Sequence, residues 1–164
     1  VMSRSIITVS AETTLTVLWR TIFKKHVNAV PVVDKKKKLL GIITREDLLA
    51  PLYPNYKDVI NDFARTNLFE ELENILQEKA TMSVKDVMCK SVVFTRDDTP
   101  IMRALSRMIA RRLNQLPVLS ANDVVVGMIT KGDVFYALFK KHLKWEIEKK
   151  RIGKSTRQIK KSSR

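Results

Sequence analysis

The sequence contains a single cysteine, Cys89, which excludes an internal disulfide and fits the reducing environment of a cytosol. It also lacks a secretory signal and any apolar run of about 18 residues, so we expect no transmembrane segment. The chain is therefore predicted to be a cytoplasmic protein.

Residue patterns for catalysis are missing as well. The two histidines, His26 and His142, have neither the spacing nor the partners of a metal site or a catalytic triad. The motifs Cys-x-x-Cys, Gly-x-Ser-x-Gly, Gly-x-x-x-x-Gly-Lys and Gly-x-Gly-x-x-Gly are absent, and four glycines argue against a phosphate-wrapping loop. Cys89 has no paired histidine near it. We thus expect no catalytic residue, no metal and no catalytic cofactor, and predict that the chain is not an enzyme.

The 164 residues suffice for one compact domain or for two small repeats that share a core. An apolar share of 45% is ordinary for a globular protein, but the net charge of +14 is unevenly distributed. Residues 140–164 hold 11 Lys and Arg against two acids, whereas the rest of the chain has 20 basic and 15 acidic side chains. Most of the excess charge therefore belongs to a C-terminal tail.

Residues 141–164 are predicted to form a basic helical extension followed by a largely disordered tail. Such an arm can bind the phosphates of a nucleic acid or an anionic lipid surface. No aromatic residue is interleaved in its last part for base stacking, so a tail that meets only water is the other interpretation.

An internal repeat organises the rest of the chain. The stretch from Val27 to Leu49 returns without a gap 86 positions later, as Leu113 to Phe135. Matched pairs include Asn28 and Asn114, Pro31 and Pro117, Gly41 and Gly127, Thr44 and Thr130, and Asp47 and Asp133. Val1 and Met2 match Val87 and Met88, whereas residues 84–86 have no counterpart in the printed sequence. This leaves open that the chain is part of a longer polypeptide.

Each copy is predicted to fold as strand, helix, strand, strand, helix. Apolar residues at helical spacing indicate one buried stripe on the first helix of each copy, as in Leu15, Leu18, Trp19, Ile22 and Phe23. Strands are expected at 6–9, 29–33 and 39–44, and again at 92–95, 115–119 and 124–130. The closing helices are expected at 46 to about 52 and at 132 to about 144.

Residues 51–83 separate the copies and are longer than a plain linker. Tyr53, Pro54 and Asn55 mark a turn, and Asn67 with Glu70 suggests a capping box. We predict a helical insertion packed on the repeats. It could equally cover a ligand entrance or a dimer face. The lysines at 35–38 are expected to face water at the tip of a hairpin.

A proline-containing strand, VPVV or LPVL, followed by GIITRED or GMITKGD and a helix resembles the CBS domain, named after cystathionine β-synthase. Two copies in register resemble the CBS pair, or Bateman module, over about residues 1–50 and 84–140. The resemblance implies an α/β fold of two β-α-β-β-α repeats about a pseudo-twofold axis. It also implies a homodimer.

Thr44 and Asp47, and likewise Thr130 and Asp133, stand three residues apart at the start of a helix. This spacing is typical of a capping box, in which the pair is structural. The same geometry suits a ligand, because a helix N-terminus favours a phosphate and a carboxylate can accept ribose hydroxyls. In CBS domains the matching residues hold the phosphate and ribose of adenosine ligands.

The resemblance further implies slots for adenine, in clefts between the copies. The residues expected to line these slots are Ile7, Ala29, Val30, Pro31, Val93, Gln115, Leu116 and Pro117. Candidates for phosphate contacts are basic and favour a nucleotide over a nucleoside: Lys25, His26, Arg45, Arg111, Arg112 and Lys131. Four of them, Lys25, His26, Arg111 and Arg112, also follow helices whose C-terminal ends favour cations.

Three functions remain open from the sequence. The first is a regulatory sensor that binds AMP, ADP, ATP or S-adenosylmethionine and signals to an upstream or separate effector domain. The second is a nucleic-acid-associated protein that uses its basic tail, with the repeats as the dimerisation unit. The third is a dimerisation module whose ligand sites no longer bind.

Overall fold

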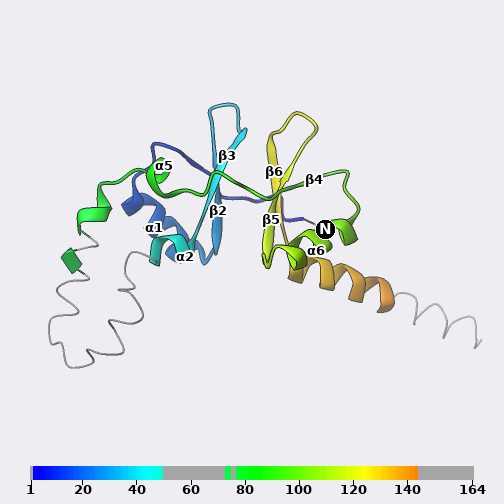
Figure 1. Ribbon diagram of the computed structural model, residues 1–164. Helices are drawn as coiled ribbons and strands as arrows, with labels where there is room; N and C mark the ends of the chain where they lie inside the picture. Colours follow the sequence, from blue (N-terminus) through cyan, green and yellow to red (C-terminus); the bar gives the residue numbers. More distant parts are fainter. Residues whose placement is uncertain (1, 50–72, 75–76, 144–164) are drawn as a thin grey trace, which may run out of the picture.

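The computed structural model describes residues 2–49, 73–74 and 77–143, which form two similar halves side by side (Figure 1). Each half has a three-stranded sheet, ordered β1-β2-β3 in repeat 1 and β4-β5-β6 in repeat 2. The helices over residues 15–25, 101–110 and 131–143 lie on one side of the two β-hairpins, below them in Figure 1. The predicted mixed α/β fold of two repeats is confirmed.

The elements follow the predicted order in both halves. Repeat 1 consists of β1 (Val9–Ser10), α1 (Leu15–Lys25), β2 (Ala29–Val33), β3 (Leu39–Thr44) and α2 (Arg45–Leu49). Repeat 2 is preceded by α5 (Val84–Val87) and consists of β4 (Thr95–Arg96), α6 (Ile101–Ala110), β5 (Gln115–Leu119), β6 (Val125–Thr130) and a helix over residues 131–143. The bounds of β2, β3 and β5 are those predicted.

The pairing register repeats with the sequence. β2 and β3 are antiparallel with Val32 opposite Gly41, and β5 and β6 are antiparallel with Val118 opposite Gly127. β1 and β4 add to β2 and β5 in parallel. Residues that correspond in the two sequence repeats therefore occupy equivalent positions in the two sheets.

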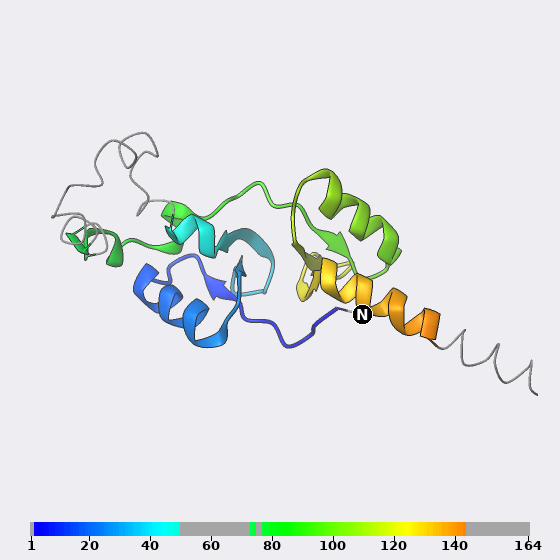
Figure 2. The same ribbon diagram turned by 90° about the horizontal axis from the view of Figure 1, so that it is seen from below.

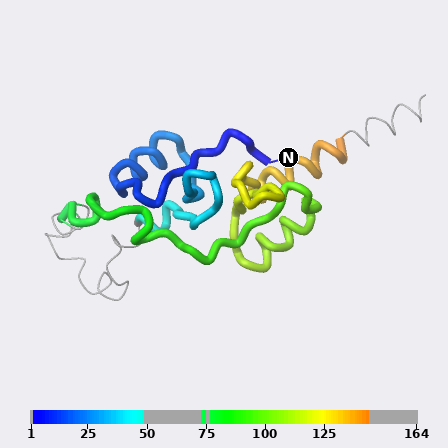
Figure 3. The backbone as a smooth tube through the Cα atoms, turned by 90° about the horizontal axis from the view of Figure 1, so that it is seen from above, coloured from blue at the N-terminus to red at the C-terminus, as the bar shows by residue number. Residues whose placement is uncertain are grey.

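The first strand of each repeat is shorter and starts later than predicted, and the segment ahead of it takes part in a strand exchange with the other repeat. Ser3 pairs with Met128 on β6, through Ser3 N–H to Met128 O at 3.0 Å and Met128 N–H to Ser3 O at 3.1 Å. Cys89 pairs with Ile42 on β3 in the same way, at 2.9 and 3.0 Å. Figure 3 shows the two crossing segments, blue and green, at opposite edges of the molecule. The residues ahead of β1 and β4 thus bridge to the other repeat.

The two repeated glycines make this exchange possible. A Cβ at Gly41 would lie 3.0 Å from Cys89 O and 2.6 Å from Met88 Sδ. A Cβ at Gly127 would lie 2.8 Å from Ser3 O and 2.7 Å from Met2 Sδ. A side chain at Gly127 would force the Ser3 carbonyl to shift, and one at Gly41 would force the Cys89 carbonyl to give by a few tenths of an ångström, so glycine fits the exchanged segment at both positions.

Each repeat has its own apolar cluster. In repeat 1, Leu15, Leu18 and Ile22 of α1 pack on the sheet, which confirms the predicted helix stripe. In repeat 2, Ala104, Leu105 and Met108 of α6 do the same. A third, smaller cluster of Val33, Leu119 and Val125 joins the halves.

The helical turn α5 was not predicted. Ser83 and Asp86 form a capping box at its start, and Val84 inserts into the cluster of repeat 1 with no exposed surface. A hydrogen bond from Lys85 Nζ to Glu12, at 2.8 Å, and the charge of Glu12 raise the pKa of Lys85. The chain between the repeats is therefore fastened to repeat 1 before it crosses to repeat 2.

Several predictions fall outside the described residues. They include the turn at Tyr53–Asn55, the capping box of Asn67 and Glu70, and the extension from residue 144 onward. Within the expected insertion, residues 73–74 and 77–80 are helical. Helices in the described ranges are all too short or too polar to cross a membrane.

Candidate ligand-binding site

The first turn of α2 is held by a reciprocal contact between Thr44 and Asp47. Thr44 donates to Asp47 Oδ2 twice, from its backbone N–H at 2.7 Å and from its hydroxyl at 2.8 Å. Asp47 N–H donates back to Thr44 Oγ1 at 3.2 Å. The pair therefore caps the helix, as the structural interpretation of the sequence predicts.

Thr130 and Asp133 repeat this geometry at the start of the helix over residues 131–143. Their three hydrogen bonds are 2.8, 2.8 and 3.0 Å long. In both repeats these contacts use only Oδ2 of the aspartate. The cap therefore leaves Oδ1 as an acceptor for another group.

The two helix starts meet at one cleft of about 840 Å³ between the repeats. Repeat 1 contributes Asn28, Ala29, Ile42, Thr44, Arg45, Glu46 and Asp47, and repeat 2 with its leading segment contributes Cys89, Ser91, Val92, Val93, Arg112, Leu113, Asn114, Gln115, Thr130, Lys131 and Gly132. The strand exchange builds this wall, because the pairing of Cys89 with Ile42 carries residues 91–93 past the end of β3. Either repeat alone would supply only part of the cleft.

Two matched backbone contacts tie the loop ahead of each central strand to the next helix. Arg45 N–H donates to Asn28 O at 2.9 Å, and Lys131 N–H donates to Asn114 O at 3.0 Å. Lys131 Nζ also reaches Asn114 Oδ1 at 3.3 Å. These contacts place a basic side chain at each helix start.

Arg45 has unused hydrogen-bonding capacity inside the cleft. Its Nε is buried and has no hydrogen-bond partner within the described part of the chain, and its Nη2 makes one long contact, 3.5 Å, to Val27 O. Its guanidinium lies 6.0 Å from the centre of the Phe23 ring. A buried N–H of a guanidinium without an acceptor is costly. Because Arg45 also lines the cleft, its guanidinium is a candidate donor to an anion bound there.

Arg112 reaches the cleft from a strained backbone position. Its φ is 54°, and the matching residue after α1, His26, has φ 52°. Both follow helices as left-handed caps, where glycine is the usual residue. Arg112 lines the cleft, whereas His26 does not.

Half of the predicted site residues line this cleft: Ala29, Thr44, Arg45, Asp47, Val93, Arg112, Gln115, Thr130 and Lys131. Val30, Pro31, Leu116 and Pro117 are instead fully buried within their strands. Their side chains support the sheet from inside and do not form the wall of the cleft. Ile7 packs against the cluster of repeat 1.

The remaining four predicted residues, Lys25, His26, Arg111 and Asp133, do not line the cleft either. Arg111 borders a neighbouring groove of about 540 Å³ together with Val93 and Arg107. Asp133 stays behind Thr130, which it holds. The cleft is therefore asymmetric, with a Thr–Asp pair on its repeat 1 side and Thr130 without Asp133 on its repeat 2 side.

Sequence reasoning missed several residues of the cleft wall, among them Asn28, Asn114, Ile42, Ser91 and Cys89. The two asparagines did carry a signal, since they match across the repeat. Cys89 is exposed and forms no disulfide, and its Sγ donates to Ser91 O at 3.6 Å. Three or more metal-ligating side chains do not cluster anywhere in the described ranges.

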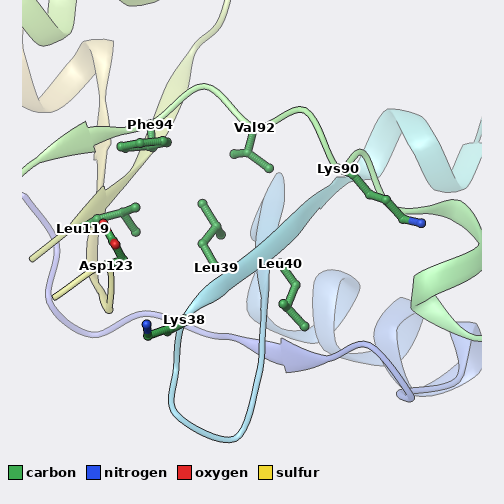
Figure 4. Close-up of a pocket in the computed structure, with 8 residues that line it drawn as sticks. All are labelled: Lys38, Leu39, Leu40, Lys90, Val92, Phe94, Leu119 and Asp123. Carbon is green, nitrogen blue, oxygen red and sulfur yellow. The ribbon is translucent and has the colours of Figure 1, made fainter.

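A second cavity, of about 400 Å³, lies toward the hairpin tips (Figure 4). Leu39 and Leu40 of β3 line it from repeat 1, and Phe94 and Leu119 line it from repeat 2. Lys38 and Asp123 stand at its edge, and the side chains of the hairpin lysines 35–38 are exposed as predicted. Four of its eight lining residues are aliphatic and three, Lys38, Lys90 and Asp123, are charged, and none of the eight is a predicted site residue.

Comparison with known proteins agrees with this architecture. The family model described as "CBS domain" matches residues 1–53 and 84–140, which cover both repeats. The chain belongs to the CBS domain family. A CBS domain-containing protein of Dictyostelium discoideum is 31% identical over 140 residues, which cover 85% of this chain and 88% of that protein.

Solved structures show the same fold. The CBS-pair protein CBSX2 of Arabidopsis thaliana superposes with a TM-score of 0.71 at 24% identity, over 86% of this chain and 92% of that one. A structure of CBSX2 in complex with AMP gives a TM-score of 0.65 at 25% identity, over 86% and 93% of the two chains. An inosine-5'-monophosphate dehydrogenase of Methanocaldococcus jannaschii is 30% identical over 134 residues, which are 82% of this chain but 22% of that enzyme.

Proposed function

We propose that this CBS pair is a regulatory module that binds an adenosine-containing ligand in the cleft between its repeats. The observation that carries the proposal is the junction at Thr44 and Asp47. There a capped helix start, an aspartate oxygen left free by the cap and the Arg45 side chain lie on one wall.

The ribose is assigned to Asp47. Its Oδ2 is engaged by Thr44, and Oδ1 can accept the hydroxyls of a ribose. The phosphate is assigned to the Arg45 guanidinium, because this side chain lines the cleft beside the start of α2. Arg112 and Lys131 add positive charge from the opposite wall. This charge favours a nucleotide over an uncharged nucleoside.

The adenine base is assigned to the space between Ala29 and Val93, with Gln115 beside it. Apolar side chains can contact the faces of the base, while backbone groups of the nearby strands can pair with its edge. AMP is the first candidate ligand, because CBSX2 has been crystallised with AMP. ADP, ATP and S-adenosylmethionine are the alternatives to be compared with it.

Binding is proposed to regulate a partner rather than to support a reaction. A ligand that contacts both walls stabilises one relative arrangement of the repeats, which an attached or separate effector can sense. The match to part of a dehydrogenase is consistent with such a segment standing beside a catalytic domain. The cytosol is the proposed location, because the free Cys89 is typical of a reducing compartment.

A homodimer is the proposed assembly. Large apolar side chains are exposed on three helices: Val17 and Phe23 on α1, Met102 and Ile109 on α6, and Phe135 and Phe139 on residues 131–143. Figure 2, the view from below, shows these three helices. Burying these side chains against a second copy would remove their apolar surface from water. Sedimentation of the wild type against Ile109→Asp tests this directly, and a wild type that sediments as a monomer would refute it.

The cap and the ligand contact can be separated by one substitution. In Asp47→Asn the amide oxygen can still accept from Thr44, so the cap is kept, but the other position becomes an NH2 donor that cannot accept a ribose hydroxyl. Asp133→Asn is the matched control, since Asp133 does not line the cleft. We expect Asp47→Asn to lose most AMP affinity and Asp133→Asn to lose little.

The assay is calorimetric titration with AMP, ADP, ATP, S-adenosylmethionine and GTP, checked by thermal unfolding. A ligand at a hundred times its dissociation constant stabilises the fold by about 2.7 kcal/mol. Stabilisation by adenosine ligands that is absent in Asp47→Asn supports the proposal. If none of these ligands binds the wild type, or if Asp47→Asn binds as well as the wild type, the Thr44–Asp47 pair is only a cap.

A further inference from the structure

Repeat 2 contains a basic groove of about 540 Å³ beside the ligand cleft. It lies between α6 and the segment that leads into β4. Its walls include three apolar side chains and three cations: Val93, Phe94, Ala110, Arg96, Arg107 and Arg111. None of the described residues that line it is acidic. The groove is therefore positively charged beside an apolar wall.

Two of the three arginines are available to a ligand. Arg96 is paired with Asp123, with Nη2 at 2.7 Å from Oδ1. Arg107 has no carboxylate partner in the described part of the chain, and its Nη1 donates to Phe94 O at 2.9 Å, which holds the guanidinium at the groove. Arg111 is exposed and likewise has no ion pair with a described residue. The groove thus offers two guanidinium groups to an anion.

These two arginines belong to a row along α6. Arg103 and Arg107 on the helix and Arg111 at its C-cap follow at intervals of four residues, which places them on one face, about 6 Å apart. Like charges at this spacing destabilise a helix. The shared fold does not require them, because the repeat offset of 86 gives the matching positions of α1 other residues: Val17, Thr21 and Lys25.

The arginine row is separate from the apolar face proposed for dimerisation. A helix turns by about 100° per residue, which places Met102 and Ile109 on one flank of α6 and Arg103 and Arg107 on the other. The buried side chains of the helix lie between the two flanks. A second copy bound to the apolar flank would therefore leave the groove accessible.

We propose that this groove binds single-stranded nucleic acid through its sugar-phosphate backbone. The even spacing of the arginines suits a polymer that carries one phosphate per unit, and a guanidinium binds phosphate oxygens with paired N–H donors. The apolar wall of Val93, Phe94 and Ala110 can contact the bases. An acidic peptide would match the charge but would leave this wall uncovered.

The charge of the whole chain favours a long polyanion. The chain has 31 Lys and Arg against 17 Asp and Glu, and 11 of the basic residues lie within residues 140–164. α6 and the helix over residues 131–143 lie in the same half of the molecule (Figure 2). A polyanion attracted to this half would meet the groove there.

Two double variants with the same loss of charge test the proposal. Arg107→Gln with Arg111→Gln removes the two available cations of the groove, and Arg20→Gln with Lys24→Gln removes two exposed cations of α1 as the matched control. Each protein is titrated into a fluorescein-labelled oligodeoxythymidine of about 12 nucleotides, and the anisotropy is measured at several salt concentrations. Urea unfolding checks that each variant folds.

We expect the wild type to bind the oligonucleotide and the groove variant to bind it about tenfold more weakly or worse. The slope of log K against log salt should fall in magnitude by about 1.4, because each phosphate contact on a single strand contributes about 0.7. The control should lose much less affinity. AMP binding should be the same in the groove variant as in the wild type, because Arg107 and Arg111 do not line the ligand cleft.

A single substitution covers the case in which the double variant is destabilised. Arg111→Gln, compared with Lys24→Gln, keeps the contact of Arg107 to Phe94 and should still weaken binding more than its control does. Equal losses in the groove and control variants, or a wild type that does not bind at about 0.15 M salt, would overturn the proposal. A poly-glutamate peptide of equal charge that binds as tightly as the oligonucleotide would also overturn it, because the groove would then fit acidic peptides.

Discussion

The strand exchange makes Gly127 a sensitive position. In Gly127→Ala the new Cβ would lie 2.8 Å from Ser3 O, a backbone atom held on β6 by hydrogen bonds of 3.0 and 3.1 Å. Met2 Sδ, at 2.7 Å, can move aside because it ends a flexible side chain, but the carbonyl cannot move without breaking the pairing. Overpacking of this kind costs about 1–3 kcal/mol.

Urea unfolding followed by tryptophan fluorescence measures the effect. Gly41→Ala should be destabilising too, but less, because the backbone oxygen it meets, that of Cys89, is 3.0 Å away. Gly132→Ala is the matched control. Its Cβ would meet only Thr130 Oγ1 at 3.5 Å, and alanine favours a helix by up to about 1 kcal/mol over glycine. If Gly127→Ala unfolds at the same urea concentration as the wild type or Gly132→Ala, the exchanged segment is not held as described.

Three further substitutions probe the cap, the core and the cleft. Arg112→Gly removes a side chain from a left-handed position, so it should raise the free energy of unfolding by about 1 kcal/mol while it weakens AMP binding, as calorimetry would show. Val84→Ala removes two buried methyl groups and should lower that free energy by about 2 kcal/mol in urea titrations; a loss below about 0.5 kcal/mol would contradict its place in the core. Thr44→Val deletes the helix cap and should cost about 1 kcal/mol by the same assay, and a neutral effect would show that the cap is dispensable.

The internal repeat carried most of the fold prediction. Local sequence patterns mark the strands that contain Pro31 and Pro117, and they also mark the neighbouring strands that contain Gly41 and Gly127. These strands form as predicted. The exchange of the first strands was not predictable, because pairing between Ser3 and Met128 joins distant residues whose local sequence is equally compatible with an intact strand. The same limit hid α5, since the apolar partners of Val84 lie on a helix and strands far away in the chain.

The candidate site was predictable in part for a similar reason. Thr44 and Asp47 stand at a helix start that the sequence marks directly. In contrast, β2 is buried along its whole length and has no alternation of apolar and polar residues. The sequence therefore did not indicate which residue of β2 faces the cleft, and Val30 lies in the core. Asp133 matches Asp47 in sequence and in its cap, yet only Asp47 lines the cleft. This difference between Asp47 and Asp133 depends on how the two repeats pack together, and an internal repeat in the sequence does not reveal that packing.

The claim that an adenosine ligand occupies the cleft is tested most directly at Cys89, the only cysteine of the chain and an exposed part of the cleft wall. The rate of its alkylation by a maleimide is measured as AMP is added, with Asp47→Asn as the control. The account predicts that AMP slows the reaction with the same half-saturating concentration as calorimetric binding, and that much more AMP is needed in the variant. An alkylation rate that stays unchanged at AMP concentrations that saturate the calorimetric signal would place the ligand elsewhere and contradict the account.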